Sequence, residues 1–186
     1  MVNFIIAIAD RFVDLLTAPF TYTDMLWVLT PLFFTAIFME LYFARYKFED
    51  MGWNSAYGNV LVLIFVAIDL FRYLHIHNEL TFLTPRNILV ITLTLLGIAL
   101  TVSNFLHAWS KSLAYGISGH LPINFLAFIA VMLVYSGLPV DFITLVSSLG
   151  ILIIFIVLIL LIKYIIPKAI ELDEDEYLER EKAPKP

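Results

Sequence analysis

The feature that most constrains this chain is a nearly continuous apolar stretch close to its C-terminus. Residues 151–162 are all Ile, Leu, Val or Phe, and they lie inside an apolar run from Phe142 to Ile166. A helix needs about 20 mostly apolar residues to cross the hydrocarbon core of a bilayer. In water, this run would expose a larger apolar patch than soluble proteins tolerate. It therefore predicts a transmembrane helix.

Four further apolar stretches have a similar character. Hydrophobic residues make up 61% of the 186 residues and charged residues only 15%, whereas a soluble domain is about one quarter charged. The sequence predicts an all-α integral membrane protein whose bundle covers residues 21–167. Its five expected transmembrane helices cover residues 25–43, 56–74, 88–109, 122–138 and 142–166.

The breaks between these stretches carry signals for helix starts and turns. Thr84 followed by Pro85 combines a capping side chain with a proline at the first helical position. Gly137 to Asp141 reads as a tight turn, in which Asp141 caps the last helix. The fourth and fifth spans are therefore expected to form a helical hairpin.

The two ends of the chain differ from the bundle. In residues 1–20 apolar side chains recur every three or four positions, with Asp10, Arg11 and Asp14 between them. This pattern predicts an amphipathic helix, which we expect to lie in the membrane interface; a peripheral helix of the bundle is the alternative. Residues 168–186 hold four Lys or Arg and seven Asp or Glu. They predict a charged, solvated cytoplasmic tail, or alternatively a docking site for a basic soluble partner.

The distribution of Lys and Arg predicts the orientation, because cytoplasmic loops are enriched in these residues. With five spans, placing the C-terminus inside puts eight Lys or Arg on the cytoplasmic side and three outside. We therefore expect a multi-pass protein of the cell membrane with its N-terminus outside. The inner set is Arg45, Lys47, Lys111, Lys163, Lys168, Arg180, Lys182 and Lys185, and the outer set is Arg11, Arg72 and Arg86.

Polar residues within the spans fall mainly in the inner leaflet of this topology. Asn104 and His107 are three residues apart, so a continuous helix would place them on one face. One interpretation is hydrogen bonding that holds the helices together, and the other is a functional polar pocket. The candidate inner residues are Glu40, Asn59, Asn104, His107 and Asn124.

A second candidate site lies in the outer half of the second span. Asp69 and Arg72 are three residues apart and can pair on one helical face. This pair either stabilises one helix or forms a cation or proton site that opens when Arg72 moves. Ser147 and Ser148 are expected at a similar depth, where their hydroxyls can supply further ligands.

Several kinds of chemistry are excluded or weakly supported. The chain has no cysteine, which removes thiolate metal sites and cysteine nucleophiles. His75, His77 and Glu79 can ligate zinc only in an extended loop and lack a fourth ligand, so no metal is expected. His107 is the only histidine placed clearly within a span, so no haem or other cofactor is expected. We place His120 in a loop without a catalytic partner.

These observations leave two functional hypotheses. The first is a non-catalytic subunit or scaffold of a membrane complex, with other membrane subunits or further copies of itself as partners in the lipid bilayer. The second is a small oligomeric channel or transporter for protons or cations. An enzyme acting on lipid is a weaker third, because Glu40 with His107 is its only plausible acid–base pair. The net charge of −5 argues against a nucleic-acid partner.

Overall fold

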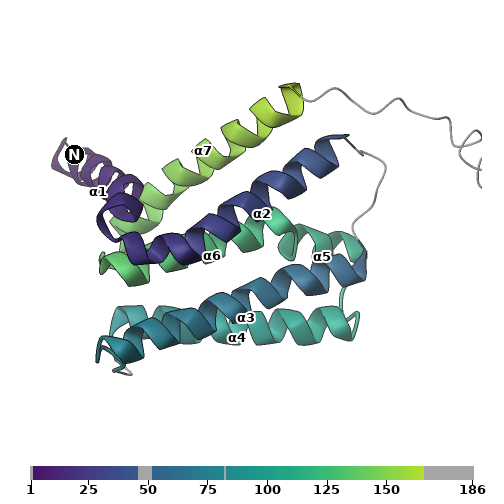
Figure 1. The fold of residues 1–186 in the computed structure, drawn as a ribbon, viewed down its shortest axis with the longest axis horizontal. Coiled ribbons are helices and arrows are strands. Elements are labelled where there is room, and N and C mark those ends of the chain that lie inside the picture. Colours follow the sequence, from purple (N-terminus) through teal and green to yellow (C-terminus); the bar gives the residue numbers. More distant parts are fainter. Residues whose placement is uncertain (1, 46–51, 82, 166–186) are drawn as a thin grey trace, which may run out of the picture.

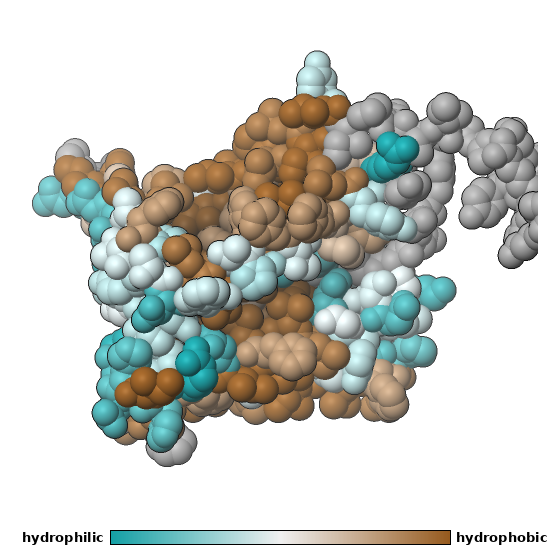
Figure 2. Space-filling model, viewed as in Figure 1, coloured by the Kyte–Doolittle hydropathy of each residue, from teal (hydrophilic) through white to brown (hydrophobic). Residues whose placement is uncertain are grey.

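The computed structural model describes residues 2–45, 52–81 and 83–165. The described residues are mainly helical and contain no strand. It has five helical segments that are long and apolar enough to cross a membrane, which confirms the predicted class and the number of spans. Figure 1 shows these segments running side by side, with apolar residues gathered over their middle part in Figure 2 and hydrophilic residues at both ends.

The chain begins with α1 (Val2–Thr21), followed by a short 3-10 helix η1 (Thr23–Met25) and the first long apolar helix α2 (Leu26–Arg45). The next two spans are α3 (Trp53–Ile76) and α4 (Pro85–Phe105), and the last is α7 (Phe142–Ile165). The fourth span is built from two helices, α5 (Lys111–Ile117) and α6 (His120–Ser136), with Ser118 and Gly119 between them.

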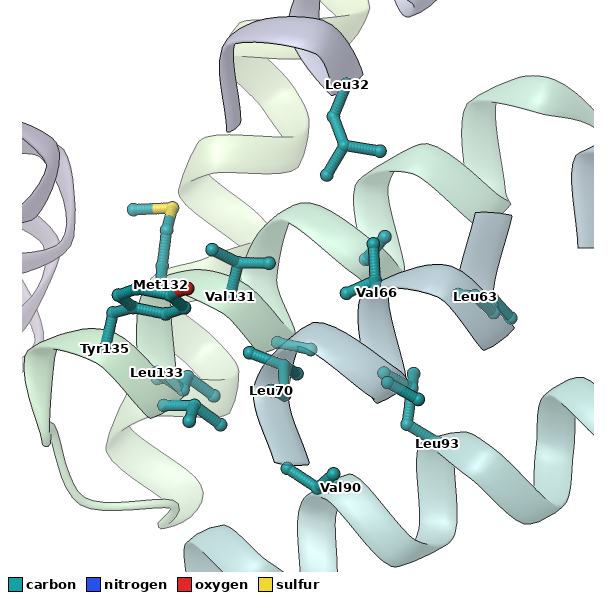
Figure 3. Packing of buried hydrophobic residues seen from close by; sticks show 14 of the residues in the cluster. Leu32, Leu63, Val66, Leu70, Val90, Leu93, Val131, Met132, Leu133 and Tyr135 are labelled. Carbon is teal, nitrogen blue, oxygen red and sulfur yellow. The ribbon is translucent and has the colours of Figure 1, made fainter. Parts of the chain in front are cut away.

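Helix α6 lies at the centre of the molecule. It contacts α1 and α2 on one side and α3 and α4 on the other, as Figure 1 shows. Apolar side chains from α2, α3, α4 and α6 form the core, and Figure 3 shows Leu32, Val66, Leu70, Leu93 and Val131 packed together there. This central position explains why α6 is the most buried of the spans.

Local sequence signals account for several helix ends. The Thr84 hydroxyl accepts a hydrogen bond from the backbone N–H of Asn87, and Pro85 begins α4, as predicted. Gly137 follows α6 in the left-handed conformation, with φ of +69°, which glycine adopts without steric cost. At the start of α7, the backbone N–H of Thr144 donates to Oδ1 of Asp141 at 2.8 Å, so the predicted cap is present.

Helix α1 packs against the first half of α7 and is not isolated from the bundle. Arg11 Nη1 donates to the Thr144 hydroxyl at 2.6 Å, and the Ser147 hydroxyl lies 3.0 Å from the carbonyl oxygen of Ile8. The aromatic ring of Phe12 lies directly over Gly150. Most large apolar side chains of α1 remain exposed, while Leu15 and Ala18 are buried. A helix is therefore present where the sequence predicted one, and its position in the membrane interface stays a prediction.

Candidate functional site

Asn104 is the centre of a buried hydrogen-bond network that joins α3, α4 and the α5–α6 link. Its side-chain Nδ2 donates to the Ser118 hydroxyl at 2.8 Å and to the Ala56 carbonyl at 3.4 Å. Its Oδ1 accepts from the indole N–H of Trp109 at 3.1 Å. Asn59 donates to the Ser118 carbonyl at 3.0 Å. Two of the predicted inner residues, Asn59 and Asn104, therefore act together and meet at Ser118.

Glu40 forms a separate cluster that joins α2, α6 and α7. Its carboxylate Oε1 lies 2.8 Å from Nε2 of His120, and its Oε2 lies 3.3 Å from Nζ of Lys163. The Glu40 side chain is only 6% exposed, whereas that of Lys163 is 49% exposed. The His120 ring also stacks on Phe43, with ring centroids 5.4 Å apart. A buried carboxylate is expensive in a membrane, and here two basic side chains compensate for it.

Three buried acceptor atoms at this end of the bundle lack a hydrogen-bond donor among the described residues. They are Glu40 Oε2, His120 Nδ1 and Asn124 Oδ1. Lys163 makes an ion pair with Glu40 Oε2 rather than a hydrogen bond. Asn124, the third predicted inner residue in this region, uses its Nδ2 to donate to the His120 carbonyl at 2.7 Å. Buried acceptors of this kind normally bind a donor, a water molecule or an ion.

A small cavity lies beside the Glu40–His120 pair. Its volume is about 10 Å³, which is close to the minimum for one water molecule. Apart from Glu40 and His120, its walls are apolar and come from α2, α6 and α7, with Phe33, Ile37 and Phe155 among them. The cavity thus suits an occupant no larger than a water molecule or a small ion.

His107 does not belong to this inner cluster. Helix α4 ends at Phe105, and His107 follows it in the left-handed conformation with φ of +52°. Its ring is exposed and stacks on Trp53, with centroids 4.2 Å apart. The prediction that His107 shares a helical face with Asn104 is wrong, because the helix has already ended. The Glu40–His107 pair that an enzyme acting on lipid would need is not formed, since the histidine paired with Glu40 is His120.

Asp69 and Arg72 form the predicted pair in the C-terminal half of α3. Asp69 Oδ1 accepts from both Nε and Nη2 of Arg72, at 3.0 and 2.6 Å. Asp69 Oδ2 accepts from the Tyr135 hydroxyl of α6 at 2.7 Å, so the carboxylate also joins two helices. Tyr135 stacks on Tyr73, and an open pocket of about 310 Å³ lies beside these residues, with Asp24 and Trp27 on its opposite wall.

The remaining outer candidates are occupied by local contacts. The Ser147 and Ser148 hydroxyls bind backbone carbonyls of α1 and α7 and make no bond to Asp69. His75 lies within α3, so the loop is not extended, and the His77 ring packs on Tyr73. Glu79 pairs with Arg86 at 2.7 Å. No group of three potential metal ligands occurs in the described part of the chain.

A layer of apolar side chains separates the cluster around Asn59 and Asn104 from the cluster around Asp69 and Tyr135. On α3, Asn59 and Asp69 are ten residues apart, or about 15 Å along the helix, and the buried residues between them are Val60, Leu63, Val66 and Ala67. On α6, Ala127, Ala130 and Val131 are the buried residues between Asn124 and Met132. Figure 3 shows part of this layer. All of these buried residues of α3 and α6 are apolar.

The prediction that His120 lies in a loop without a partner is wrong, because His120 begins α6 and pairs with Glu40. Sequence reasoning also missed Tyr135, and it used Lys163 only to assign the orientation. The signal for His120 was present: it stands two residues before Pro122, at the start of the apolar stretch of α6, where proline is common in a first helical turn. The pairing of Tyr135 with Asp69 depends on how α3 and α6 pack, which no local pattern of either helix reveals.

Comparison of this chain with protein-family models, with curated proteins and with solved structures gave no match in any of the three. The side chains themselves must therefore identify the function. In the described residues they present three small polar clusters, those of Asn104 and Glu40 at one end of the bundle and that of Asp69 toward the other, and each links several parts of the fold.

Proposed function

We propose that this protein is a non-catalytic subunit or scaffold of a membrane complex. The observation that supports this most is the apolar layer between the polar clusters, which includes Leu32, Val66 and Val131. Asn59, Asn104 and Asp69 use their polar atoms to join helices to one another. Such bonds hold membrane helices together, and they leave no polar path through the middle of one bundle.

The exposed apolar surface of α7 is suited to association with other membrane helices. Helix α7 exposes a long series of large apolar side chains, including Leu145, Leu149, Ile153, Val157 and Leu160. Lipid chains or the helices of other subunits must cover this surface, since water does not. We propose other membrane subunits, or further copies of this chain, as the partners within the bilayer.

The proposed location is the cell membrane, with the N-terminus outside and the C-terminus in the cytoplasm. The excess of Lys and Arg on the inner side supports this orientation. We place α1 at the outer interface, where its Arg11 and Asp14 reach water and its Leu15 packs inward. The charged tail, residues 168–186, lies outside the described residues, and its cytoplasmic position rests on its composition.

Purification from native membranes in a mild detergent, followed by native mass spectrometry, tests this proposal. Unrelated chains in fixed stoichiometry are expected to accompany the protein. Recovery of this chain alone, as a monomer or a homo-oligomer in every mild detergent used, would contradict a role as a subunit of a mixed complex.

The second candidate function is a proton or cation channel or transporter, formed by an oligomer. Two buried atoms near Glu40, His120 Nδ1 and Asn124 Oδ1, have no hydrogen-bond partner among the described residues, and they favour this function because such atoms can bind a proton or a cation. In liposomes, a transporter of this kind should lose its flux in the Glu40→Gln variant and retain it in the exposed-site control Asp10→Asn. Equal flux in both variants would remove Glu40 from the pathway.

A further inference from the structure

The open pocket of about 310 Å³ lies at the end of the bundle where α2 begins and α3 ends, as Figure 1 shows for these two helices. This volume is at the lower end of the range for pockets that hold small ligands, about 300–1,000 Å³. Asp24 of η1 and Trp27 of α2 form one wall. The opposite wall comes from the end of α3 and from α6, with Arg72, Tyr73, Ile76, His77 and Tyr135. The lining therefore contains an acid, a base and several aromatic rings.

Asp24 is the acid of this pocket, and its carboxylate is free to bind a ligand. It is exposed and makes no hydrogen bond or ion pair within the described part of the chain. Its position is nevertheless fixed, because the neighbouring Met25 is fully buried in the core. Trp27, on the same wall, is 86% exposed. A carboxylate attracts an ammonium group by its charge, and tryptophan is the strongest aromatic partner of such a cation.

Arg72 provides the positive charge on the opposite wall. It uses two of the five N–H donors of a guanidinium group to bind Asp69 Oδ1. The Arg72 side chain is 59% exposed, so its other donors can reach a ligand in the pocket. Guanidinium groups match the geometry of phosphate oxygens and bind them well. The pocket thus has one place for a cation and one for a phosphate.

The aromatic rings beside Arg72 hold one another in place. The ring centroid of Tyr73 lies 4.0 Å from that of Tyr135 and 4.1 Å from that of His77. The Tyr73 hydroxyl donates to the Tyr135 carbonyl at 3.3 Å, and the Tyr135 hydroxyl donates to Asp69 at 2.7 Å. This wall is therefore formed before a ligand binds, which lowers the cost of ordering side chains on binding.

The two charges of the pocket select a ligand that carries both signs. A simple anion would face Asp24 as well as Arg72, and a simple cation would face Arg72. A zwitterion can place its ammonium group at Asp24 and its phosphate at Arg72. The depths of the two residues agree with a lipid headgroup, in which the phosphate is attached nearer to the acyl chains. Arg72 lies about one turn inside the end of α3, whereas Asp24 precedes α2.

Exposed apolar side chains continue from both walls toward the middle of the bundle. On α3, Ile68 and Phe65 lie four and seven residues before Arg72, so all three share one face of the helix. On α2, the exposed Phe34 follows Trp27 by seven residues, which is two turns. The acyl chains of a lipid whose headgroup occupies the pocket would cover these surfaces. This continuity favours a lipid over a small soluble ligand.

We propose that this pocket binds the zwitterionic headgroup of a phospholipid. The ammonium group of an ethanolamine or choline headgroup lies between Asp24 and the Trp27 ring, and the phosphate accepts N–H donors from Arg72. The acyl chains follow the exposed apolar faces of α2 and α3. Binding is non-covalent, so no bond forms or breaks. The site goes beyond the proposed subunit role and does not depend on it.

Native mass spectrometry of the full chain, released from detergent micelles, measures the retention of added lipids. Three dioleoyl lipids are compared at equal concentration: phosphatidylcholine, which carries both charges, phosphatidylglycerol, which carries only the phosphate charge, and a trimethylammonium lipid without phosphate. Phosphatidylcholine should be retained at least about three-fold more than either of the others, because each of them lacks one ionic contact. Equal retention of phosphatidylglycerol would contradict the ammonium contact, and equal retention of the trimethylammonium lipid would contradict the phosphate contact.

Variants of Asp24 and Trp27 locate this preference in the pocket. Both side chains are exposed, so their replacement leaves the core intact. Asp24→Asn should lower the retention of phosphatidylcholine to that of phosphatidylglycerol, and Trp27→Ala should lower it about three-fold. The matched controls are Asp10→Asn on α1 and Tyr164→Ala, an equally exposed aromatic residue at the other end of the bundle. Neither control should change retention, and an unchanged preference in Asp24→Asn would overturn the proposal.

A soluble headgroup distinguishes a lipid from a small soluble zwitterion as the ligand. Glycerophosphocholine carries the same headgroup charges as phosphatidylcholine but has no acyl chains. Added at equal concentration, it should leave bound phosphatidylcholine in place, because it cannot cover the apolar faces of α2 and α3. Displacement of the lipid by glycerophosphocholine at that concentration would contradict the assignment of the pocket to a membrane lipid.

Discussion

At the residue scale, Asn104 is the polar side chain on which most of the inner bundle depends. It is 1% exposed and makes three hydrogen bonds that connect α3, α4, Trp109 and Ser118. We expect Asn104→Leu to lower the free energy of unfolding by about 2 kcal/mol, since hydrogen bonds between membrane helices average about 0.6 kcal/mol each. Reversible unfolding in mixed micelles measures this change.

The control for this variant is Asn3→Leu, which changes an exposed asparagine on α1. It should alter the free energy of unfolding by less than about 0.5 kcal/mol. Equal effects of the two variants would mean that the Asn104 network does not stabilise the fold.

Asp69 is a second polar residue that can be tested by substitution, and it acts through two partners, Arg72 and Tyr135. The double variant Asp69→Asn with Arg72→Gln should be less destabilising than the sum of the single variants, by about 1 kcal/mol. Tyr135→Phe should couple to Asp69→Asn in the same direction. Asp24→Asn with Arg72→Gln is the control cycle, because Asp24 borders the same pocket without bonding to Arg72. Strict additivity in the Asp69 cycles would argue for an independent ion site.

Asp141 gives a pH-dependent prediction outside the spans. The backbone N–H of Thr144 holds the pKa of this carboxyl below its usual value, and Arg11 contributes in the same direction. Its stabilising effect is therefore complete above about pH 4, and it is lost as the pH falls through the lowered folded-state pKa. Asp141→Ala should lower the free energy of unfolding by about 1 kcal/mol at pH 7, and by less at pH 3.

Thermal unfolding in detergent at the two pH values measures the Asp141 effect. Asp10→Ala, which removes an exposed acidic residue from α1, serves as the control. A stability difference for Asp141→Ala that stays constant between pH 7 and pH 3 would contradict the capping role of the ionised carboxylate.

At the scale of elements, the contact between α1 and α7 depends on Gly150. A Cβ at this position would lie 2.8 Å from the Phe12 ring, too close for an undisturbed packing. Gly150→Ala should destabilise the protein by roughly 1–3 kcal/mol, the usual cost of overpacking. The matched control is Gly58→Ala, where the new methyl group meets no neighbour. The same substitution in a Phe12→Ala background should be nearly neutral, and an undiminished penalty there would contradict the packing argument.

The middles of the helices were easier to predict from this sequence than their ends. The apolar stretches defined five spans because a bilayer requires about 20 apolar residues per helix. The ends depended on weaker local signals. Thr84 and Asp141 cap their helices as expected, whereas α4 stops at Phe105, before His107, although no proline or glycine separates them.

The candidate site was predictable only in part, for a physical reason. Glu40, Asn59 and Asn104 stood out because polar groups in a membrane are costly. Their partners are Trp109, just before α5, Ser118 between α5 and α6, and His120 at the start of α6. Which of these side chains faces inward depends on how residues 109–120 pack against α2 and α3. Periodicity along one helix carries no information about such contacts.

At the scale of the whole molecule, the central feature is the apolar layer between two polar clusters. Glu40 and Asn104 lie at one end of the bundle, and Asp69 with Tyr135 lies toward the other. Leu63 and Val66 of α3 are buried in the core between them. This layer is the observation on which the proposed role as a subunit or scaffold rests.

Side-specific cysteine labelling tests this central claim most directly, because the native chain has no cysteine of its own. A membrane-impermeant maleimide is applied from each side to three single-cysteine variants: Asn78→Cys, Val66→Cys and Ser112→Cys. The account predicts that Asn78→Cys reacts only from outside, Ser112→Cys only from inside, and Val66→Cys from neither side. Reaction of Val66→Cys would show a water-filled path through the bundle and contradict the account, and exchanged sides for the other two would reverse the proposed orientation.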